Sequence, residues 1–348
     1  MSEHPAAGLT GVGSLGEFGL IERITAQFPL RHPSVLKAVG DDAAVYRPDP
    51  GMAQVVTTDM LLEGIHFDLA YVPLRHLGYK AVVVNLSDLA AMYARPLGIT
   101  VSIGFSSRFP VEAIDELYAG IHLACERYGV DLLGGDTVSS RQGLIISVTA
   151  IGQVAEEDAV YRSGAMPRDL ICVSGDLGAA YAGLLVLERE KSAFLNSPDL
   201  QPDLSDYDYV AGRQLKPEAR FDITDKLRAL DIHPTSMMDI SDGVASELHH
   251  ICRQSHCGAT IYEDKLPIDF QTMKVSEEFQ IAPATFALNG GEDYELLFTV
   301  PVQAFNLLQG VPEIMVIGHT TEDVGLIQMV LGSGDVVDVQ AQGWQHFR

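Results

Sequence analysis

Hydrophobic residues recur along this chain with two periods, and each period predicts one kind of element. Apolar side chains at positions 111, 114, 117, 121, 125 and 128 form one face of a helix, which we expect Gly129 to close. The stretch LGITVSIGF (97–105) alternates apolar and polar residues, as a strand does, and GLIISVTAIGQV (143–154) predicts a buried strand. The segment HLGYKAVVVNLSDLAAMYARP (76–96) is ambiguous. Its valines favour a strand, but its long run of alanine and leucine favours a helix, and we predict a helix.

The second half repeats this alternation. We predict a strand in DLICVSGDLG (169–178), a helix through AAYAGLLVLERE (179–190), a strand leading into a helix in MMDISDGVASELHHICRQS (237–255), and a turn leading into a strand in GGEDYELLFTV (290–300). Strands mixed with helices in both halves predict two α/β or α+β domains.

Three further segments complete the organisation of the chain. EFGLIERITAQF (17–28) predicts a short amphipathic helix, whereas DLLGGDTVSS (131–140) and the stretch 192–209, which is rich in Pro, Asp and Ser, are expected to be loops. A length of 348 residues allows two domains with separate cores. The expected boundaries are a flexible N-terminal arm at 1–16, an N-terminal domain at 17–154 and a C-terminal domain at 155–348, with the acidic AEED at 155–158 as the linker.

A hairpin brings two acidic segments together. KAVGDDAAVYRPDPGMAQVVTTD (37–59) reads as two strands joined by the turn RPDPGM. If the hairpin folds near Asp49–Pro50, residues whose numbers sum to about 100 lie opposite one another. This register places Asp42 near Thr57, Thr58 and Asp59.

Composition narrows the class of protein. A hydrophobic content of 47% and a charged content of 20% fit a soluble globular enzyme. The net charge of −24, without a Lys/Arg block, argues against a nucleic-acid partner. Four scattered cysteines indicate no disulfide scaffold, no signal peptide is expected, and no apolar run approaches the roughly 20 residues that span a bilayer. We therefore expect a cytoplasmic protein without a membrane segment.

Two motifs that suggest a dinucleotide site and a zinc site are not supported by their surroundings or spacing. GVGSLG (11–16) has the letters of a dinucleotide fingerprint, but no strand precedes it, and no P-loop sequence occurs in the chain. His249, Cys252 and His256 share one helical face, so zinc is conceivable, although their spacing matches no standard zinc finger.

Carboxylates placed beside Gly, Ser or Thr carry the strongest chemical signal. Each one alone could be only a turn or cap residue, but the set is large: Asp41, Asp42, Asp59, Asp88, Asp136, Asp239, Asp242, Glu292 and Asp293. Carboxylates and hydroxyls are the oxygen donors that magnesium prefers, and clustered like charges repel unless cations lie between them. The set predicts a metal-bridged polyphosphate site that performs phosphoryl transfer. No catalytic nucleophile pattern stands out, and an acceptor that is itself a phosphate needs no strong general base.

One of these motifs occurs twice. Asn85-Leu86-Ser87-Asp88 resembles Asp239-Ile240-Ser241-Asp242, which indicates either an old duplication or two helix starts built from the same residues. Our hypothesis for the second copy is that Ser241 or Asp242 caps the helix, while Asp239 and Asp242 face magnesium bound to phosphates.

The motifs together resemble a known family. GDDAAV, TTDMLLEGIHFDL, LGYKAVVVNLSDLAAM, GGDT, RSGAMPRD, DISDG and GGEDYELLFTV match, in order and spacing, those of the thiamine-monophosphate kinase family, in the superfamily of aminoimidazole ribonucleotide synthetase and selenophosphate synthetase. The resemblance extends from about Gly16 to Arg348. It implies ATP-dependent phosphorylation of thiamine monophosphate to thiamine diphosphate, the last step of thiamine diphosphate biosynthesis. It further implies in-line transfer with several Mg²⁺ ions, and a homodimer that joins its N-terminal sheets and holds each active site between two domains.

The resemblance also implies roles for residues that match its motifs. The implied metal ligands are Asp42, Thr57, Thr58, Asp59, Asp88, Asp136, Asp239 and Asp242. The implied nucleotide contacts are Tyr118, Gly135, Asp136, Arg162 and Ser241, and the implied substrate contacts are His66, Glu292 and Trp344. An arginine offers a planar fork to phosphate, and a cationic thiazolium suits an aromatic face or a carboxylate. Trp344 could instead pack a C-terminal tail, and His66 could be a hydrogen-bonded structural residue.

Three alternatives stay open. A selenophosphate synthetase would need a reactive cysteine in its N-terminal Gly-rich loop, but the first cysteine here is Cys125, and an aminoimidazole ribonucleotide synthetase would lack NLSDLAAM. A non-catalytic nucleotide sensor would keep the ATP ligands and be free to lose His66 and Glu292. The stretches 104–110 and 192–209 match no family motif.

Overall fold

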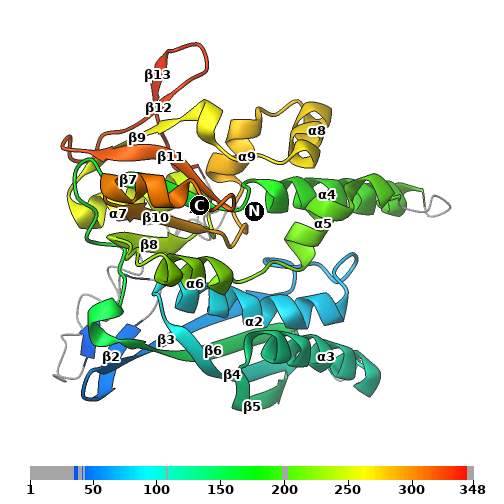
Figure 1. Ribbon diagram of the computed structural model, residues 1–348. Coiled ribbons are helices and arrows are strands. Elements are labelled where there is room, and N and C mark those ends of the chain that lie inside the picture. The colour runs from blue at the N-terminus through cyan, green and yellow to red at the C-terminus, as the bar shows by residue number, and fades with distance from the viewer. Residues whose placement is uncertain (1–34, 38–40, 42–43, 107–108, 198–202, 343–348) are drawn as a thin grey trace, which may run out of the picture.

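The structure, a computed structural model, describes residues 35–37, 41, 44–106, 109–197 and 203–342, and its strands form two sheets (Figure 1). The first sheet has the order β1-β2-β3-β6-β4-β5. Its strands are β1 (Val35–Lys37), β2 (Ala44–Asp49), β3 (Met52–Leu62), β4 (Arg95–Phe105), β5 (Asp131–Ser139) and β6 (Ile145–Ala155). The pairs are antiparallel except β4–β5, which is parallel.

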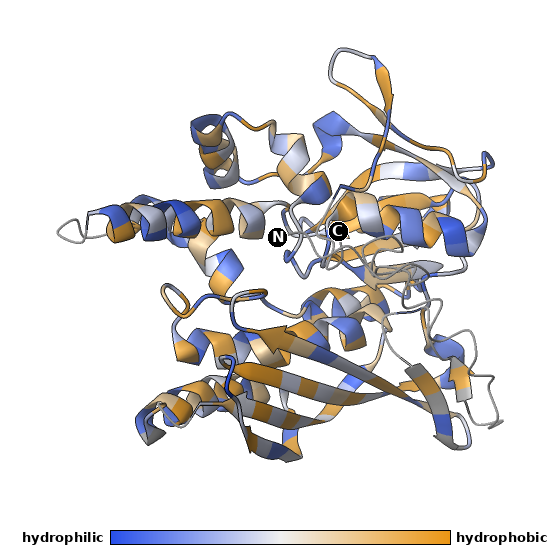
Figure 2. Ribbon diagram, turned by 180° about the vertical axis from the view of Figure 1, so that it is seen from behind, coloured by the Kyte–Doolittle hydropathy of each residue, from blue (hydrophilic) through white to orange (hydrophobic). Residues whose placement is uncertain are grey.

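Two helices cover one face of this sheet, α2 (Leu74–Ala91) and α3 (Val111–Tyr128) (Figure 1). Apolar and polar residues alternate along the sheet strands, so one face supplies the core beneath the helices (Figure 2). Gly129 closes α3 in a left-handed conformation. The predicted helix over 111–128 and the predicted strands over 97–105 and 143–154 are confirmed. The helix predicted over 76–96 is confirmed as α2, but it ends at Ala91, and β4 begins at Arg95.

The β2–β3 hairpin has the register that the sequence predicted. Ala44 lies opposite Val56, Val45 opposite Val55 and Tyr46 opposite Gln54, so each pair of numbers sums to 100. Asp42, the residue that this register was expected to bring near Thr57, lies outside the described residues, as do the arm at 1–16 and the predicted helix at 17–28.

The second sheet has the order β13-β12-β9-β11-β7-β10-β8. Its strands are β7 (Leu170–Ser174), β8 (Ser236–Asp239), β9 (Gly258–Tyr262), β10 (Leu296–Val300), β11 (Ile314–Thr321), β12 (Ile327–Val330) and β13 (Val336–Asp338). The helices in this half are α4 (Ala179–Asn196), α5 (Asp208–Leu215), α6 (Phe221–Ala229), α7 (Val244–Ser255), α8 (Phe270–Phe279), α9 (Pro283–Asn289) and α10 (Phe305–Leu308). Short 3-10 helices are η2 (Glu156–Asp158), η3 (Ser205–Tyr207), η4 (Glu263–Lys265) and η5 (Val302–Ala304).

Each face of the second sheet has its own core. Ile171 and Val173 pack with α7 and α9 on one face, whereas Cys172 and Phe298 pack with α6 and α10 on the other. The end of α2 joins this second core through Ala90 and Ala91, so α2 and α6 lie between the two sheets (Figure 1). The predicted two-part α/β (α+β) architecture is confirmed.

Two loop predictions are wrong. The segment 131–140 is mostly strand β5, all nine residues of which are exposed. It pairs through its backbone with β4, so it needs no burial pattern, and periodicity could not detect it. In the segment 192–209, α4 continues to Asn196, whose side chain bonds the Ser192 carbonyl, and η3 and the start of α5 follow from Ser205 onward.

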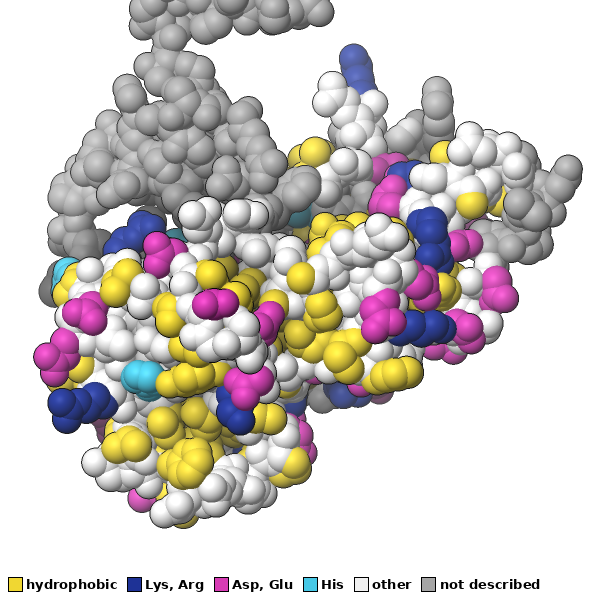
Figure 3. Space-filling view, turned by 90° about the horizontal axis from the view of Figure 1, so that it is seen from above, with side chains coloured by type: hydrophobic (Ala, Val, Ile, Leu, Met, Phe, Trp, Pro, Cys, Tyr) yellow, Lys and Arg dark blue, Asp and Glu magenta, His cyan; other side chains and the backbone are white. Residues whose placement is uncertain are grey.

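The surface carries both acidic and hydrophobic side chains (Figure 3). Seen from above, Asp and Glu side chains are spread over the molecule, with hydrophobic side chains exposed between them (Figure 3). In the described ranges, every helix is too short or too polar to cross a membrane.

Candidate functional site

Residues within one turn of α2 bond two other segments, β3 and the end of β8. Thr57 Oγ1 on β3 donates to Asp88 Oδ2 at 2.5 Å, and the Asp59 backbone N–H donates to Asn85 Oδ1 at 3.0 Å. Ser87 Oγ donates to Asp239 Oδ2 at the end of β8, at 2.6 Å. One helix therefore joins the acidic motifs of both sheets.

Burial gives these bonds their importance. Asn85 and Ser87 are fully buried and Asp239 is 3% exposed. A buried carboxylate without partners is costly, so the Ser87 hydroxyl is part of what allows Asp239 to lie at the seam between the sheets. The two copies of the repeated motif thus contact each other directly, Ser87 of the first with Asp239 of the second.

The GGEDYEL segment forms a tight loop beside the β8 end. Glu292 N–H donates to the Ser241 carbonyl at 2.7 Å, and Tyr294 N–H to that of Ile240 at 2.9 Å. Gly291, Glu292 and Tyr294 all have positive φ, and a Cβ on Gly291 would lie 2.5 Å from the Ser241 carbonyl oxygen. Only glycine fits there. The left-handed Glu292 and Tyr294 each cost on the order of 1 kcal/mol, which the surrounding bonds must offset.

Two partners from different halves of the chain hold the Glu292 carboxylate. Lys80 Nζ on α2 lies 3.2 Å from Glu292 Oε2, and Gln214 Nε2 on α5 donates to the same oxygen at 2.6 Å. Lys80 is 4% exposed and also donates to the Gln214 carbonyl at 2.9 Å. Sequence reasoning missed Lys80. The available signal was a lysine inside the apolar run GYKAVVV, where an unpaired charge would not be tolerated.

Glu247 is a second residue that the sequence reading missed. It is buried, and its Oε1 accepts the N–H groups of Ser241 at 3.2 Å and Asp242 at 2.8 Å. Burial, with a smaller contribution from the Asp242 charge, raises the pKa of Glu247 well above its ordinary value. The hypothesis that Ser241 or Asp242 caps α7 is wrong: the helix begins after Gly243 without a side-chain cap, and Glu247 reaches back to these residues instead.

Several of these carboxylates lie close enough to Tyr294 to affect its hydroxyl. The pKa of the buried Tyr294 hydroxyl is raised well above its usual value, first by burial and then by the charges of Glu292, Asp59, Asp239 and Asp88. Four carboxylates from both halves of the chain therefore lie within electrostatic range of one side chain.

These residues do not form a ready-made metal cage. Within the described ranges, no three His, Cys, Asp or Glu side chains are arranged to hold an ion. The donor atoms of Thr57, Asp59, Asp88 and Asp239 are oxygens, as a magnesium ion prefers, and magnesium commonly completes its shell with water and phosphate oxygens. The residues fit an ion that arrives with a phosphate ligand.

Arg162 lies at the border of this group. Its backbone N–H donates to Asp41 Oδ1 at 2.9 Å, and its Nε is 3.8 Å from the same oxygen. Its charge also helps to lower the pKa of His250 on α7 to about 4, although burial of that ring is the larger cause. Arg162 therefore sits between Asp41 and α7.

Four of the predicted site residues lie away from the α2 group. Thr58 points to the opposite face of β3 from Thr57, where its hydroxyl donates to the Val148 carbonyl at 3.0 Å. Asp136 aligns across the sheet with Ser102, Ser147 and Met60, so three strand spacings, about 14 Å, separate it from β3. Gly135 is its neighbour on β5, and Tyr118 lies on α3. Within one chain, Thr58, Gly135, Asp136 and Tyr118 do not join the α2 group.

The predictions that remain are the two substrate contacts, His66 and Trp344, and the possible zinc cluster. His66 Nδ1 accepts the Leu62 N–H at 3.1 Å, whereas Trp344 lies outside the described residues. A zinc role for His249, Cys252 and His256 gains no support. His249 Nε2 contacts the Val339 carbonyl at 2.8 Å, and the free thiol of Cys252 contacts that of Cys257.

Two family models match this chain. AIR synthase related protein, N-terminal domain, covers residues 40–154, and AIR synthase related protein, C-terminal domain, covers residues 167–329. Together the two models span most of the chain. The first matches the half that holds the first sheet, and the second matches the half that holds the second sheet.

Individual relatives are similar along most of their length. The thiamine-monophosphate kinase of Bacillus subtilis (strain 168) is 36% identical over 296 residues, which are 85% of this chain and 86% of the relative. That of Aquifex aeolicus (strain VF5) is 33% identical over 96% of this chain and 98% of the relative. The solved structure of "AaThiL complexed with AMPPCP and TMP" is 30% identical, covers 98% of this chain and 100% of that one, and superposes with a TM-score of 0.83.

Proposed function

This chain belongs to the thiamine-monophosphate kinase family of AIR synthase related proteins, and from that premise we propose that it transfers a phosphoryl group from ATP to thiamine monophosphate, giving thiamine diphosphate. One observation carries the proposal: α2 brings Thr57, Asp88 and Asp239 together from both sheets, with Glu292 in the adjoining loop. A relative of 30% identity and the same fold is described as a complex with AMPPCP and TMP.

The acidic residues bind the nucleotide end of the reaction. Asp59, Asp88, Asp239 and Asp242 supply carboxylate oxygens for Mg²⁺, and Thr57 and Ser87 fix two of these carboxylates by hydrogen bonds. When bound, magnesium neutralises phosphate charge and orients phosphate oxygens for in-line transfer. Asp42 is a further ligand in this proposal, and Arg162 and Ser241 contact the phosphates.

The acceptor end is built around Glu292. Its carboxylate, fixed by Lys80 and Gln214, attracts the permanently cationic thiazolium ring, and Trp344 and His66 are the remaining proposed contacts. The acceptor phosphate is largely ionised at neutral pH, its second pKa being about 6, so its oxygen attacks without a dedicated general base. The chain's own residues thus bind, orient and neutralise, and no covalent enzyme intermediate is needed.

A homodimer is part of the proposal. The helix-free face of the first sheet carries Met60, which is 53% exposed, and the edge strand β5 exposes Leu133 at 58% and Val138 at 55%. Exposed apolar side chains along an edge strand favour pairing with a second sheet. A second copy on this face also gives Tyr118, Gly135 and Asp136 a route to a nucleotide that they do not have within one chain.

The cytoplasm is the proposed location. All four cysteines are free thiols, and three of them are buried. Free thiols fit a reducing compartment.

The direct test is a coupled product assay. Purified protein with Mg²⁺, ATP and thiamine monophosphate is expected to form thiamine diphosphate and ADP in equal amounts, with loss of product on chelation and none from free thiamine. Absence of product while nucleotide still binds would favour the sensor alternative instead.

Asp239→Asn tests the site within this assay. Asparagine can still accept the Ser87 hydroxyl, so the fold persists, but the lost charge is expected to reduce turnover by at least about a hundredfold. Asp225→Asn, which removes an exposed carboxylate on α6, is the matched control and retains turnover. Similar turnover in both variants would remove Asp239 from the proposed metal site.

A further inference from the structure

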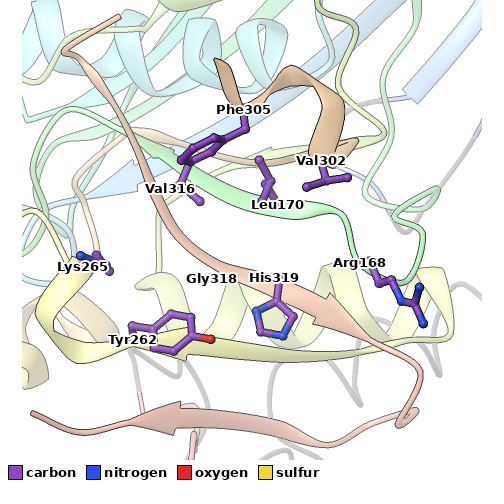
Figure 4. Close-up of a pocket in the computed structure, with 9 residues that line it drawn as sticks. All are labelled: Arg168, Leu170, Tyr262, Lys265, Val302, Phe305, Val316, Gly318 and His319. Carbon is purple, nitrogen blue, oxygen red and sulfur yellow. The ribbon is translucent and has the colours of Figure 1, made fainter. Parts of the chain in front are cut away.

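A cavity of about 410 Å³ opens on the second sheet (Figure 4). Its residues come from the segment just before β7 and the start of β7, the end of β9, the middle of β11, and η4, η5 and α10. Cavities of this size hold small organic ligands in other proteins. Arg168 belongs to the RSGAMPRD motif, but none of the residues that line the cavity was assigned a part in phosphoryl transfer.

The strand register separates this cavity from the kinase site. Asp239 pairs with Leu296 at the start of β10, whereas Leu170, in the cavity, pairs with Val300 at the end of β10 and with His319 on β11. Four residues along a strand are about 13 Å, and three strand spacings from β8 to β11 are about 14 Å. His319 therefore lies roughly 20 Å from Asp239, so one small ligand cannot occupy both places.

The floor and walls of the cavity are apolar and aromatic. Leu170 and Val316 on the sheet face Phe305 and Val302, whose side chains are 41% and 52% exposed. The rings of Tyr262 and His319 lie side by side, with centroids 6.1 Å apart and planes inclined by 32°. An aromatic ring that enters between Phe305 and this pair would remove apolar surface from water on two sides.

The charge of the cavity is opposite to that of the protein. The chain has 47 Asp and Glu against 23 Lys and Arg, yet the charged residues that line the cavity are Arg168 and Lys265. Asp169 turns inward, where it accepts from Met166 N–H at 2.8 Å and the Thr235 hydroxyl at 2.7 Å. Lys265 Nζ lies 3.8 Å from Asp264 Oδ2.

Arg168 is held in an unusual position. Its φ is +74°, a left-handed conformation that glycine adopts without strain, and its N–H bonds the Thr320 carbonyl at 2.9 Å. Among the described residues, its guanidinium has no ion pair or side-chain hydrogen bond. A strained residue that carries an unpaired cation at the rim of a cavity points to a ligand for that cation.

We propose that this cavity binds a small aromatic anion, with its ring between Phe305 and the Tyr262–His319 pair and its anionic group at Arg168, at one end of the cavity (Figure 4). The guanidinium provides a charge-assisted hydrogen bond to a carboxylate, sulfonate or phosphate, and the apolar walls exclude water from the ring. The inference does not depend on the kinase activity, because it uses different residues on a different part of the sheet.

The test uses 1-anilinonaphthalene-8-sulfonate, an aromatic anion whose fluorescence rises in apolar surroundings, on the full chain with saturating Mg²⁺-ATP present to occupy any nucleotide site. We expect saturable binding at one site per chain. Arg168→Gly and Phe305→Asp are each expected to weaken it about tenfold or more. Arg141→Gly, which removes an exposed arginine from a turn in the other half of the chain, leaves it unchanged.

The uncharged analogue N-phenyl-1-naphthylamine separates the ring from the charge. It is expected to bind wild type and Arg168→Gly alike and to be weakened by Phe305→Asp. The melting temperature of Arg168→Gly stays level or rises, because glycine removes the left-handed strain, so weaker binding cannot be attributed to unfolding. No saturable binding of the sulfonate, or equal binding by wild type and both cavity variants, would overturn the proposal. Equal loss of both probes in Arg168→Gly would overturn the anionic part.

Discussion

At the scale of single residues, Asp293 shows how the GGEDYEL loop depends on protonation. Its carboxyl is 1% exposed and accepts the Gly178 N–H at 2.8 Å. Burial raises the pKa of Asp293 to about 7, although the neighbouring Arg213 charge opposes the rise. Below that pH the folded protein keeps this proton, while the unfolded chain releases it above its ordinary pKa of about 4.

A pH dependence of stability follows from this difference. Between about pH 4 and pH 7 the folded state binds more protons than the unfolded state, so the Asp293 contribution to the free energy of unfolding falls as pH rises, by up to about 1.4 kcal/mol per pH unit. Above pH 7 this contribution is constant. Urea unfolding at several pH values should show the slope in wild type and a shallower one in Asp293→Asn. Parallel curves for the two proteins would show that Asp293 does not titrate in this range.

The sequence predicts the contacts of the candidate site that follow from local patterns. It misses the contacts that depend on tertiary packing. The hairpin register follows from one turn, so the pairing of Ala44 with Val56 and of Val45 with Val55 was accessible from spacing alone. The bonds of Ser87 to Asp239 and of Lys80 to Glu292 depend on how α2 packs between two sheets, which no local pattern specifies. For the same reason, Thr58 was placed with Thr57 although strand alternation turns it to the other face.

At the scale of elements, a pair of glycines sets the distance between α2 and α3. A Cβ on Gly78 would lie 1.9 Å from the Leu117 carbonyl oxygen, and one on Gly120 would lie 1.9 Å from that of Arg75. The helix backbones therefore touch at two points. Because α2 carries Lys80, Asn85, Ser87 and Asp88, this contact also fixes how far these candidate site residues lie from α3.

Gly120→Ala should consequently be severely destabilising. A methyl group cannot fit without separating the helices, and we expect a loss of about 3 kcal/mol or more in the free energy of unfolding. Gly212→Ala is the matched control: Gly212 lies in α5 with open space around it, so alanine should stabilise by up to about 1 kcal/mol through helix propensity. Chemical denaturation of both variants measures the difference. Similar small effects would mean that the two helices can move apart at little cost.

The sequence reading succeeded for elements that bury one face and failed for those that do not. α3 buries a stripe that includes Leu117 and Ile121, so its period is visible in the letters. β5 is exposed throughout and is a strand only because β4 offers it a backbone partner, which is a tertiary property.

At the scale of the whole molecule, the helix-free face of the first sheet is the proposed contact between two copies. A charge at its centre should separate them. Met60→Arg is expected to convert a dimer into a monomer in sedimentation velocity, because an arginine opposite its own copy repels and must be desolvated. Val324→Arg, at an exposed turn between β11 and β12, should leave the assembly unchanged. A wild-type protein that sediments as a monomer at micromolar concentration would remove this dimer from the proposal.

The Ser87–Asp239 bond also constrains the order in which a new chain matures. These residues are 152 positions apart, so Asp239 gains its Ser87 partner only when both halves of the chain have folded and docked. Closing so long a loop is entropically costly and slow compared with forming a hairpin or a helix. Secondary structure should therefore precede the proposed binding site in time, and a nascent protein passes through a stage that has its sheets but lacks the docked Ser87–Asp239 contact.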